Sequence, residues 1–362
     1  FAIIYLRSKN NKITKFMANK KTILITGGGR FIGHHFVEGL LKKTDWDIVI
    51  LDALTYAGNL NRLTDIDIWD KEKHRVKFVW HDLRAPISDT THKMIGDLDF
   101  IWHLAAESHV DRSLEDSRPF VMSNVLGTAN LLEYVKKYQP SLKKFVTFST
   151  DEVFGPAPSG VDYKEGDTCN PSNPYSAAKE GEEAISKAFA FSFGLPIMIT
   201  RTMNVYGERQ HPEKFIPKTV SAILKNEPVS IHGLPGNISS RKWIHARNVC
   251  DALIFLLDRG EIIEKKYQND SSHGVYHIVG EERNVLDLAN RISEIIRGKK
   301  LEEGEIQYID FHSTRPGHDL RYSLSGEKLK NMGFEYPMKL KESFDKMIKW
   351  MIKPENQKWL EI

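Results

Sequence analysis

The sequence predicts an α/β protein: a Rossmann-type, doubly wound parallel sheet followed by a smaller C-terminal α/β substrate-binding domain. Two observations carry this prediction. Short apolar runs typical of buried strands alternate with helical patterns through the N-terminal half, and such alternation favours a parallel sheet with helices on both faces. A glycine cluster, G-G-G-R-F-I-G at 27–33, separates the first strand from the first helix, as in dinucleotide-binding domains.

The expected elements follow in chain order. Six apolar segments are predicted as strands of the main sheet, at 21–26, 47–51, 76–80, 99–104, 144–148 and 195–201. The clearest helices between them cover 119–137 and 174–193, the second with a proline in its first turn. Later elements are expected to be a helix over 217–225, a strand over 229–232, a Gly/Pro/Ser-rich loop over 233–240, a helix over 244–258, a strand over 275–279, a helix over 285–297, a strand over 306–311 and an amphipathic helix over 340–351.

Three parts of the chain are expected. Residues 1–16 form a tail that is upstream or disordered sequence, because Met17 and four further residues lead directly into the first strand. An NAD-binding Rossmann domain covers 17–203, and the chain is expected to return to it around 243–280. Residues 204–362 belong mainly to the substrate-binding domain.

Composition excludes several classes of protein. A net charge of +3 over 362 residues, with 41% apolar and 27% charged residues, gives no argument for binding nucleic acid or a membrane surface. No apolar run approaches the roughly 18 residues of a membrane-spanning helix. The two cysteines, Cys169 and Cys250, fit no metal spacing and are too few for a disulfide framework. We therefore expect a cytoplasmic protein without a metal site.

The glycine cluster predicts a cofactor site. Glycines let the backbone approach a pyrophosphate, which the free N–H groups at the start of a helix can bind. Asp52 ends the second predicted strand, 19 residues after Gly33. A carboxylate there accepts hydrogen bonds from both ribose hydroxyls and repels a 2′-phosphate, so NAD is favoured over NADP. The alternative interpretation is an ordinary glycine-rich turn before a helix.

A polar triplet, Thr150-Asp151-Glu152, follows the strand at 144–148. Two adjacent carboxylates at a strand end rarely help a fold, because they must be solvated or paired. They suit a reaction that needs an acid and a base in one pocket. The alternative is that Thr150 or Asp151 caps the next helix.

Tyr175 and Lys179 form a Y-x-x-x-K pair on the helix expected over 174–193. Residues four apart share a helix face. A nearby cation favours tyrosinate and lowers the tyrosine pKa from about 10, which makes Tyr175 a candidate base for a sugar or alcohol hydroxyl. The spacing alone is weak evidence, because Tyr5 and Lys9 match it as well.

Taken together, several motifs resemble the nucleotide-sugar 4,6-dehydratases, a branch of the extended short-chain dehydrogenase/reductase family. The resemblance covers about residues 21–350. The T-D-E triplet separates this branch from related 4-epimerases and decarboxylases, which usually lack it. The matching motifs are G-G-x-x-F-I-G, D-A-L-T-Y-A-G-N at 52–59, H-L-A-A-E-S-H-V-D-R-S at 103–113, S-T-D-E-V-F-G, P-Y-S-A-A-K, P-E-K-F-I-P at 212–217 and R-P-G-H-D at 315–319.

This resemblance implies a reaction in which NAD is tightly bound and regenerated in each turnover. Tyr175 takes the proton of the sugar 4-hydroxyl as the C4 hydride leaves, and Lys179 holds the nicotinamide ribose. Glu152 then removes the C5 proton, Asp151 protonates the departing 6-hydroxyl, and Thr150 hydrogen-bonds the 4-oxygen. To act as an acid, Asp151 must hold a proton, so its pKa is expected to be raised by burial or by Glu152. The product is a 4-keto-6-deoxy sugar, on the way to rhamnose-type deoxysugars.

The resemblance also implies binding residues. Any single Arg or His among them has the alternative of being a solvated or structural group. The expected cofactor residues are Gly27, Phe31, Ile32, Gly33, Asp52, Leu54, Thr55, Gly58, Asp82, Leu83, Leu104, Ala105, Ala106, Tyr175 and Lys179. The expected substrate residues are Ser108, His109, Thr150, Asn204, Lys214, Phe215, Arg241, Arg315 and His318.

Some positions depart from the family pattern. Arg30 stands where the family usually has glycine, where its guanidinium can crowd the pyrophosphate or cap it. The loop before Arg241 is one residue longer, and Arg247-Asn248 replaces an acidic pair. Val205 replaces a second asparagine of some dTDP-glucose enzymes, which tilts the prediction from dTDP-glucose toward UDP-glucose.

The alternatives are a 4-epimerase or decarboxylase of the same family, or an inactive nucleotide-binding protein. By resemblance, a homodimer joined through the helices that begin at Pro119 and Pro174 is expected. The expected partner is a nucleotide sugar.

Overall fold

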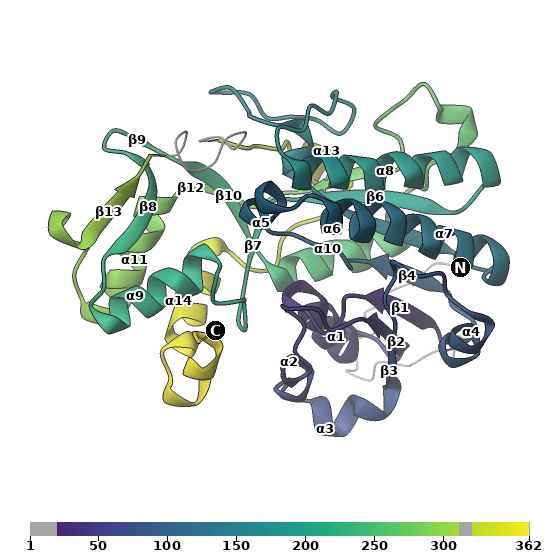
Figure 1. The fold of residues 1–362 in the computed structure, drawn as a ribbon, viewed down its shortest axis with the longest axis horizontal. Coiled ribbons are helices and arrows are strands. Elements are labelled where there is room, and N and C mark those ends of the chain that lie inside the picture. The colour runs from purple at the N-terminus through teal and green to yellow at the C-terminus, as the bar shows by residue number, and fades with distance from the viewer. Residues whose placement is uncertain (1–19, 311–320, 362) are drawn as a thin grey trace, which may run out of the picture.

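The structure, a computed structural model, describes residues 20–310 and 321–361. Its larger unit contains a seven-stranded sheet made of β1 (Thr22–Thr26), β2 (Asp47–Asp52), β3 (Val76–Trp80), β4 (Phe100–His103), β5 (Lys144–Thr150), β6 (Ile197–Thr202) and β11 (Val275–Ile278). The strand order is β11-β6-β5-β4-β1-β2-β3, and every neighbouring pair is parallel (Figure 1). The predicted Rossmann-type parallel sheet is confirmed.

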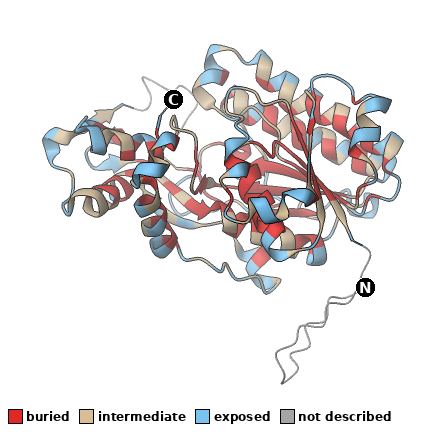
Figure 2. Cartoon of the chain, turned by 90° about the horizontal axis from the view of Figure 1, so that it is seen from below, coloured by how far each residue is buried: buried red, intermediate tan, exposed pale blue. Residues whose placement is uncertain are grey.

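Helices cover both faces of this sheet. They include α1 (Phe31–Lys43) and α10 (Ala246–Arg259) on one face, and α7 (Gly127–Tyr138) and α8 (Pro174–Phe193) on the other. Within β1, Ile23 and Ile25 belong to the first core and Leu24 to the second. Because successive side chains of a strand point to opposite faces, an unbroken apolar run is what a sheet buried on both sides requires. Figure 2 shows the buried residues concentrated in this layer.

The helix expected over 119–137 contains a turn of π-helix. It consists of α6 (Arg118–Phe120), the π-helix η2 (Val121–Leu126) and α7. Such turns are rare and often lie at functional sites. Asn124 in η2 is fully buried and fixes the backbone of Glu107, accepting from its N–H at 2.8 Å and donating to its carbonyl at 3.1 Å. The π-turn therefore holds a segment that borders the cofactor cavity described below.

The shorter helices of the larger unit connect strands along its edges. They are α2 (Asn61–Thr64), α3 (Trp69–Glu72), η1 (Lys73–Arg75), α4 (Asp89–Ile95), α5 (Val110–Glu115), η3 (Asp151–Phe154), η4 (Lys265–Tyr267) and α13 (Glu327–Asn331). In the described part of the chain, none of the helices is long and apolar enough to cross a lipid bilayer.

The smaller unit lies to the left of the sheet in Figure 1. Its two three-stranded sheets have the orders β12-β10-β7 and β13-β8-β9. The strands are β7 (Asn204–Tyr206), β8 (Val229–Leu234), β9 (Asn237–Ile238), β10 (Ser240–His245), β12 (Glu281–Asn284) and β13 (Ile306–Ile309). The helices are α9 (Phe215–Lys225), α11 (Val285–Arg297), η5 (Glu303–Glu305), α14 (Leu340–Met351) and η6 (Pro354–Trp359).

The prediction of a loop over 233–240 is wrong. This segment forms a β-hairpin, in which Gly233 pairs with Ile238 and Leu234 with Asn237. Gly233 and Gly236 have φ angles of 125° and 84°, which only glycine adopts readily. The glycines thus make the tight turn of a hairpin, and the polar composition hid the two short strands.

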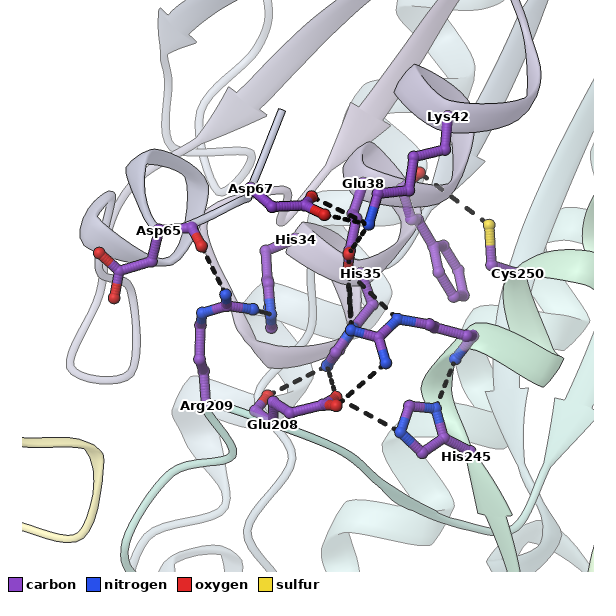
Figure 3. Close-up of polar contacts among 12 residues, drawn as sticks. His34, His35, Glu38, Lys42, Asp65, Asp67, Glu208, Arg209, His245 and Cys250 are labelled. Carbon is purple, nitrogen blue, oxygen red and sulfur yellow. Dashed lines mark hydrogen bonds and ion pairs between the residues drawn. The ribbon is translucent and has the colours of Figure 1, made fainter. Parts of the chain in front are cut away.

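A buried polar cluster joins the two units (Figure 3). Helix α1 supplies His34, His35 and Glu38, and the segment after β7 supplies Glu208. Arg247 of α10 bridges the two carboxylates, lying 3.3 Å from Glu38 Oε2 and 3.0 Å from Glu208 Oε1. Arg247, one of the departures from the family pattern, is therefore the shared counter-ion of two nearly buried acids.

Candidate active site

The glycine turn lies between β1 and α1 with little free space. Gly27 has a φ of 74°, and a Cβ atom on Gly33 would lie 2.2 Å from the Gly27 carbonyl oxygen. Both positions thus require glycine. The contact brings the start of α1 against the end of β1, which leaves N–H groups of the first helical turn available for an anion.

Asp52 closes the turn from the neighbouring strand. Its Oδ2 accepts from the backbone N–H of Gly29 at 2.9 Å, and its Oδ1 accepts from that of Leu54 at 2.8 Å. A carboxylate fixed there disfavours a second negative group, which is the charge argument for NAD over NADP.

A cavity of about 50 Å³ adjoins this turn. The expected cofactor residues that line it are Gly27, Asp52, Thr55, Asp82, Leu83, Ala105 and Ala106. Those that do not line it are Phe31, Ile32, Gly33, Leu54, Gly58, Leu104, Tyr175 and Lys179. The structure therefore gathers about half of the expected set around one cavity, and these residues fit a dinucleotide through their close backbone turn and fixed carboxylate.

Arg30 also lines this cavity. Its backbone has a φ of −96°, an ordinary conformation, so glycine is not required at this position. The guanidinium donates to Thr55 Oγ1 at 2.7 Å and to the Ala106 carbonyl, and it lies 3.6 Å from the Glu107 carboxylate. The side chain thus spans the cavity wall as a fixed cation.

A buried polar chain supports the cavity, and sequence reasoning missed it. Thr26 Oγ1 accepts from the backbone N–H groups of Leu104 and Ala105, both at 3.0 Å, and bonds His103 Nδ1 at 2.8 Å. His103 Nε2 bonds Thr128 Oγ1 at 2.8 Å. Burial and the charge of Lys179 lower the pKa of His103 to about 3, so its ring is neutral. The only sign of these hydrogen bonds in the sequence was Thr26 at the end of β1.

The T-D-E triplet lies at the end of β5, where η3 begins. Thr150 Oγ1 accepts from the backbone N–H of Glu152 at 3.3 Å, so the capping interpretation is also correct. The same hydroxyl donates to Asp151 Oδ1 at 3.0 Å. Burial, then the charge of Glu152, raises the pKa of Asp151 to about 7. The expectation of a raised Asp151 pKa is confirmed.

Tyr175 lies in the first turn of α8, whose start is fixed by a capping box. Asn173 Oδ1 accepts from the backbone N–H of Ser176 at 2.9 Å, and Ser176 Oγ accepts from that of Asn173 at 3.2 Å. The ring of Tyr175 packs edge-on against Phe120. Its hydroxyl lies within reach of the charges of Glu152 and Asp151, both of which add to the effect of burial in raising its pKa. The fold thus places Tyr175 beside the triplet.

The pKa of Tyr175 is raised in the structure, whereas a lowered pKa was expected beside Lys179. Burial, followed by the charge of Glu152, raises that pKa above its usual range. The Lys179 ammonium donates to Glu182 Oε2 at 2.5 Å and to the Phe148 carbonyl at 2.7 Å. Its partner is therefore Glu182, a fully buried residue that the sequence analysis did not single out, and burial raises the pKa of this carboxyl group to about 7 despite the charge of Lys179.

A second cavity, of about 250 Å³, lies between the two units. The catalytic and substrate residues expected there that do line it are Asp151, Glu152, Ser108, His109, Asn204, Lys214, Phe215 and Arg241. The guanidinium of Arg241 lies 4.9 Å from the centre of the Tyr322 ring and donates to the Ser240 carbonyl at 2.7 Å. Arg315 and His318 lie outside the described residues.

Sequence reasoning missed several residues of this cavity, including Ser230, His232 and Tyr322. Strand β8 alternates between buried Val229 and Ile231 and half-buried Ser230 and His232. That alternation of period two was a usable signal for a polar face. Tyr322 carried no such signal.

The sequence matches the profile of a known protein family. A family profile described as GDP-mannose 4,6 dehydratase matches residues 24–349. The chain belongs to this family. The chain is 38% identical over 314 residues to the low-salt glycan biosynthesis protein of Haloferax volcanii, and the match covers 86% of this chain and 93% of that one.

Two further relatives carry informative names. One is the trifunctional UDP-glucose 4,6-dehydratase/UDP-4-keto-6-deoxy-D-glucose 3,5-epimerase/UDP-4-keto-L-rhamnose-reductase of Arabidopsis thaliana. It is 35% identical over 343 residues, a match that covers 94% of this chain but only 48% of that protein. The other is the solved dTDP-glucose 4,6-dehydratase of Streptomyces venezuelae, with NAD and TYD bound. It has a TM-score of 0.80 and 32% identity, over 94% of this chain and 99% of that chain.

Proposed function

We propose that this protein removes water from a nucleoside-diphosphate glucose, forming the 4-keto-6-deoxy sugar with NAD as a tightly held cofactor. The observation that carries this proposal is the pair Asp151 and Glu152 at a cavity that also contains Arg241, with Tyr175 close enough to both carboxyl groups that their charges, added to the effect of burial, raise its pKa. An elimination needs both an acid and a base, and a diphosphate suits a guanidinium. The names of the relatives agree with this reaction.

Bound NAD would supply the hydride chemistry of the reaction, the oxidation at C4 and the reduction at C6. The residues around the glycine turn, with Asp52 and Lys179, would hold it. Tyr175 and Thr150 hydrogen-bond the 4-oxygen, Glu152 removes the C5 proton, and Asp151 protonates the departing 6-hydroxyl. Asp151 suits this role because its pKa of about 7 keeps a useful fraction protonated at neutral pH.

The proposed domains are an NAD-binding domain over 17–203, with a return around 243–280, and a mainly substrate-binding domain over 204–362. Supporting this division, the Val275–Ile278 strand pairs with β6 of the large sheet. We place the protein in the cytoplasm.

A homodimer formed through the helices that begin near Pro119 and at Pro174 is also part of the proposal. Val121, Met122 and Leu126 of η2 are 51%, 45% and 43% exposed, and exposed apolar residues on these helices support association. Light scattering of the purified protein distinguishes a dimer from a monomer.

The nucleotide is proposed to be uridine diphosphate, with deoxythymidine diphosphate as the alternative. Asn204 lines the substrate cavity, and it is followed by Val205 where some dTDP-glucose enzymes have a second asparagine. The Arabidopsis relative is named for UDP-glucose.

Product mass tests the function. The purified protein is incubated separately with UDP-glucose and dTDP-glucose, without added NAD. Loss of one water supports a dehydratase with retained NAD, and the faster substrate identifies the nucleotide. A product of unchanged mass would indicate an epimerase, loss of carbon dioxide from a uronic acid substrate a decarboxylase, and no reaction after addition of NAD an inactive binding protein.

A further inference from the structure

Arg62 of α2 is a buried cation that contacts three separate segments of the chain. It is 3% exposed. Its Nη1 donates to the Ala57 carbonyl at 2.9 Å and lies 3.5 Å from the Gly29 carbonyl oxygen, and its Nε donates to the Arg209 carbonyl at 3.0 Å. Gly29 belongs to the glycine turn, and Arg209 belongs to the segment 207–214 between β7 and α9. One rigid guanidinium fork therefore connects the cofactor turn to the smaller unit.

The segment 207–214 reaches the substrate cavity, which Glu213 lines. It is held in an uncommon backbone conformation, because Arg209 has a φ of 63°, and this region is unfavourable for a residue other than glycine. The guanidinium of Arg209 donates to the Asp65 carbonyl of the larger unit at 2.6 Å (Figure 3). Contacts with the larger unit, including the hydrogen bond from Arg62, thus maintain the position of this segment.

The loop after β2 makes a second connection between the two cavities. Thr55 lines the cofactor cavity, and the neighbouring Tyr56 hydroxyl donates to Glu213 of the substrate cavity at 3.2 Å. Arg62 fixes this loop as well, through its hydrogen bond to the carbonyl of Ala57. The same guanidinium therefore restrains both connections.

The charge of Arg62 is suited to an anion at the glycine turn. Among the described residues it donates only to carbonyl oxygens. Burial, then the charges of Arg30 and Arg209, lower its pKa to about 10, and Asp52 acts in the opposite direction. Arg62 is therefore charged at neutral pH and lies near two other cations. The negative charge of a diphosphate is attracted to such a group more strongly in a buried site than in water.

We propose that Arg62 couples the two cavities. Cofactor bound at the glycine turn compensates its charge, and the same guanidinium holds the segment 207–214 where Glu213 lines the substrate cavity. This inference rests on the proposed function. Arg62 lines neither cavity, so it is a positioning residue. Its consequence is a linkage: NAD increases the affinity for the nucleotide sugar by the same factor as the nucleotide increases the affinity for NAD.

Equilibrium dialysis of the holoenzyme measures this linkage without turnover. The affinity for NAD is determined alone, with UDP and with dTDP, neither of which carries the hexose that reacts. For the wild-type protein we expect one nucleotide to increase the affinity for NAD by about tenfold, within the usual range of such coupling. In Arg62→Met this factor should fall to near one, and the affinity for NAD alone should fall by about tenfold.

Two further variants separate coupling from structural damage. Arg62→Lys keeps the charge but not the fork, so it should recover most of the affinity for NAD and little of the linkage. Arg75→Met is the matched control and should leave both quantities at their wild-type values, because Arg75 lines neither cavity. Arg75 is 8% exposed and also donates to three backbone carbonyls, those of Leu41, Thr44 and Trp46.

The inference is overturned if Arg62→Met keeps the wild-type linkage or the wild-type affinity for NAD, or if Arg75→Met loses them to the same extent. It is also overturned if neither nucleotide changes the affinity of the wild-type protein for NAD. Failure of the proposed function is distinguishable from these outcomes, because in that case the product assay yields no dehydrated sugar, whatever the dialysis shows.

Discussion

Glu182 controls the charge beside Tyr175, although it does not touch the substrate cavity. Its carboxylate neutralises Lys179 and helps to keep the pKa of Tyr175 high. In Glu182→Gln, the positive charge of Lys179 is uncompensated, so we expect the pKa of Tyr175 to fall. Removal of one partner from a buried ion pair should also destabilise the fold by about 3 kcal/mol.

Difference spectra of tyrosinate over a pH titration, with Tyr175→Phe as the reference, measure the first effect, and denaturant unfolding measures the second. Glu180→Gln is the matched control, because Glu180 is on the same helix but is only half buried. An unchanged Tyr175 titration in Glu182→Gln would contradict this account.

Arg30 supplies a cation to the wall of the cofactor cavity. Its guanidinium is held by Thr55 and Ala106, so it can meet an anionic cofactor with little reorganisation. We expect Arg30→Gly to weaken NAD binding by about tenfold, the value of one charge-assisted hydrogen bond, and Arg30→Lys to weaken it less. Calorimetry on protein stripped of cofactor measures this affinity. Tighter binding by Arg30→Gly would mean that the side chain crowds the diphosphate.

At the residue scale, the sequence predicted interactions between neighbours better than those across the fold. The raised pKa of Asp151 follows from an adjacent carboxylate and a strand end, and both are visible in the sequence. The Lys179–Glu182 pair was not predicted, because Lys and Glu three residues apart are common on exposed helix faces. Only the packing of α8 against the sheet shows that this pair is buried.

Helix α8 positions Tyr175 through its first turn. Asn173 caps this helix, and its amide also donates to Glu152 Oε2 at 3.3 Å. Asn173→Ala should therefore destabilise the protein by about 1 kcal/mol and lower kcat, because both Tyr175 and Glu152 lose positional restraint. Asn173→Ser keeps the cap but lacks the amide, so we expect it to restore the stability and not the full kcat. Thermal unfolding and steady-state kinetics measure both, and an Ala variant with wild-type values would be inconsistent with this role.

Element prediction succeeded where one periodicity dominated. The helices at Pro174–Phe193, Val285–Arg297 and Leu340–Met351 begin and end where the sequence predicted, because a cap or an apolar stripe defines each of them. Strands β7 and β12 were missed, since they are three and four residues long and are stabilised by pairing with β10. Such short strands have too little pattern of their own.

At the scale of the whole molecule, Arg247 links the two units through buried charge. Burial alone would raise the pKa of Glu38, but the hydrogen bond to His35 and the charge of Arg247 hold it well below its ordinary value of 4.5. Burial likewise disfavours the ionised form of Glu208. Its interactions with His245, His35 and Arg247 outweigh this effect, so the pKa of Glu208 is also held low. Both carboxylates therefore remain ionised between the units.

Arg247→Met should leave these two carboxylates without their shared cation. We expect a loss of about 3 kcal/mol in the free energy of unfolding at pH 7, the lower end for a broken buried pair, because a third of the Arg247 side chain is exposed. Arg259→Met is the control, since that arginine pairs with Asp258 on the surface of the same helix and such pairs contribute about 0–1 kcal/mol.

The dependence on pH gives the second readout of Arg247→Met. A carboxylate whose pKa is lower in the folded protein stabilises it above the unfolded pKa, and this stabilisation is lost as pH falls through the folded pKa. The wild-type protein thus loses stability as pH falls below about 4.5. In Arg247→Met the folded pKa values of Glu38 and Glu208 rise, so less stability is lost on acidification. The gap between variant and wild type should be largest near pH 7 and narrow toward pH 3 in urea unfolding curves. A gap that is constant with pH would mean that Arg247 acts through its apolar packing, and that the two units are held together without this ionic link.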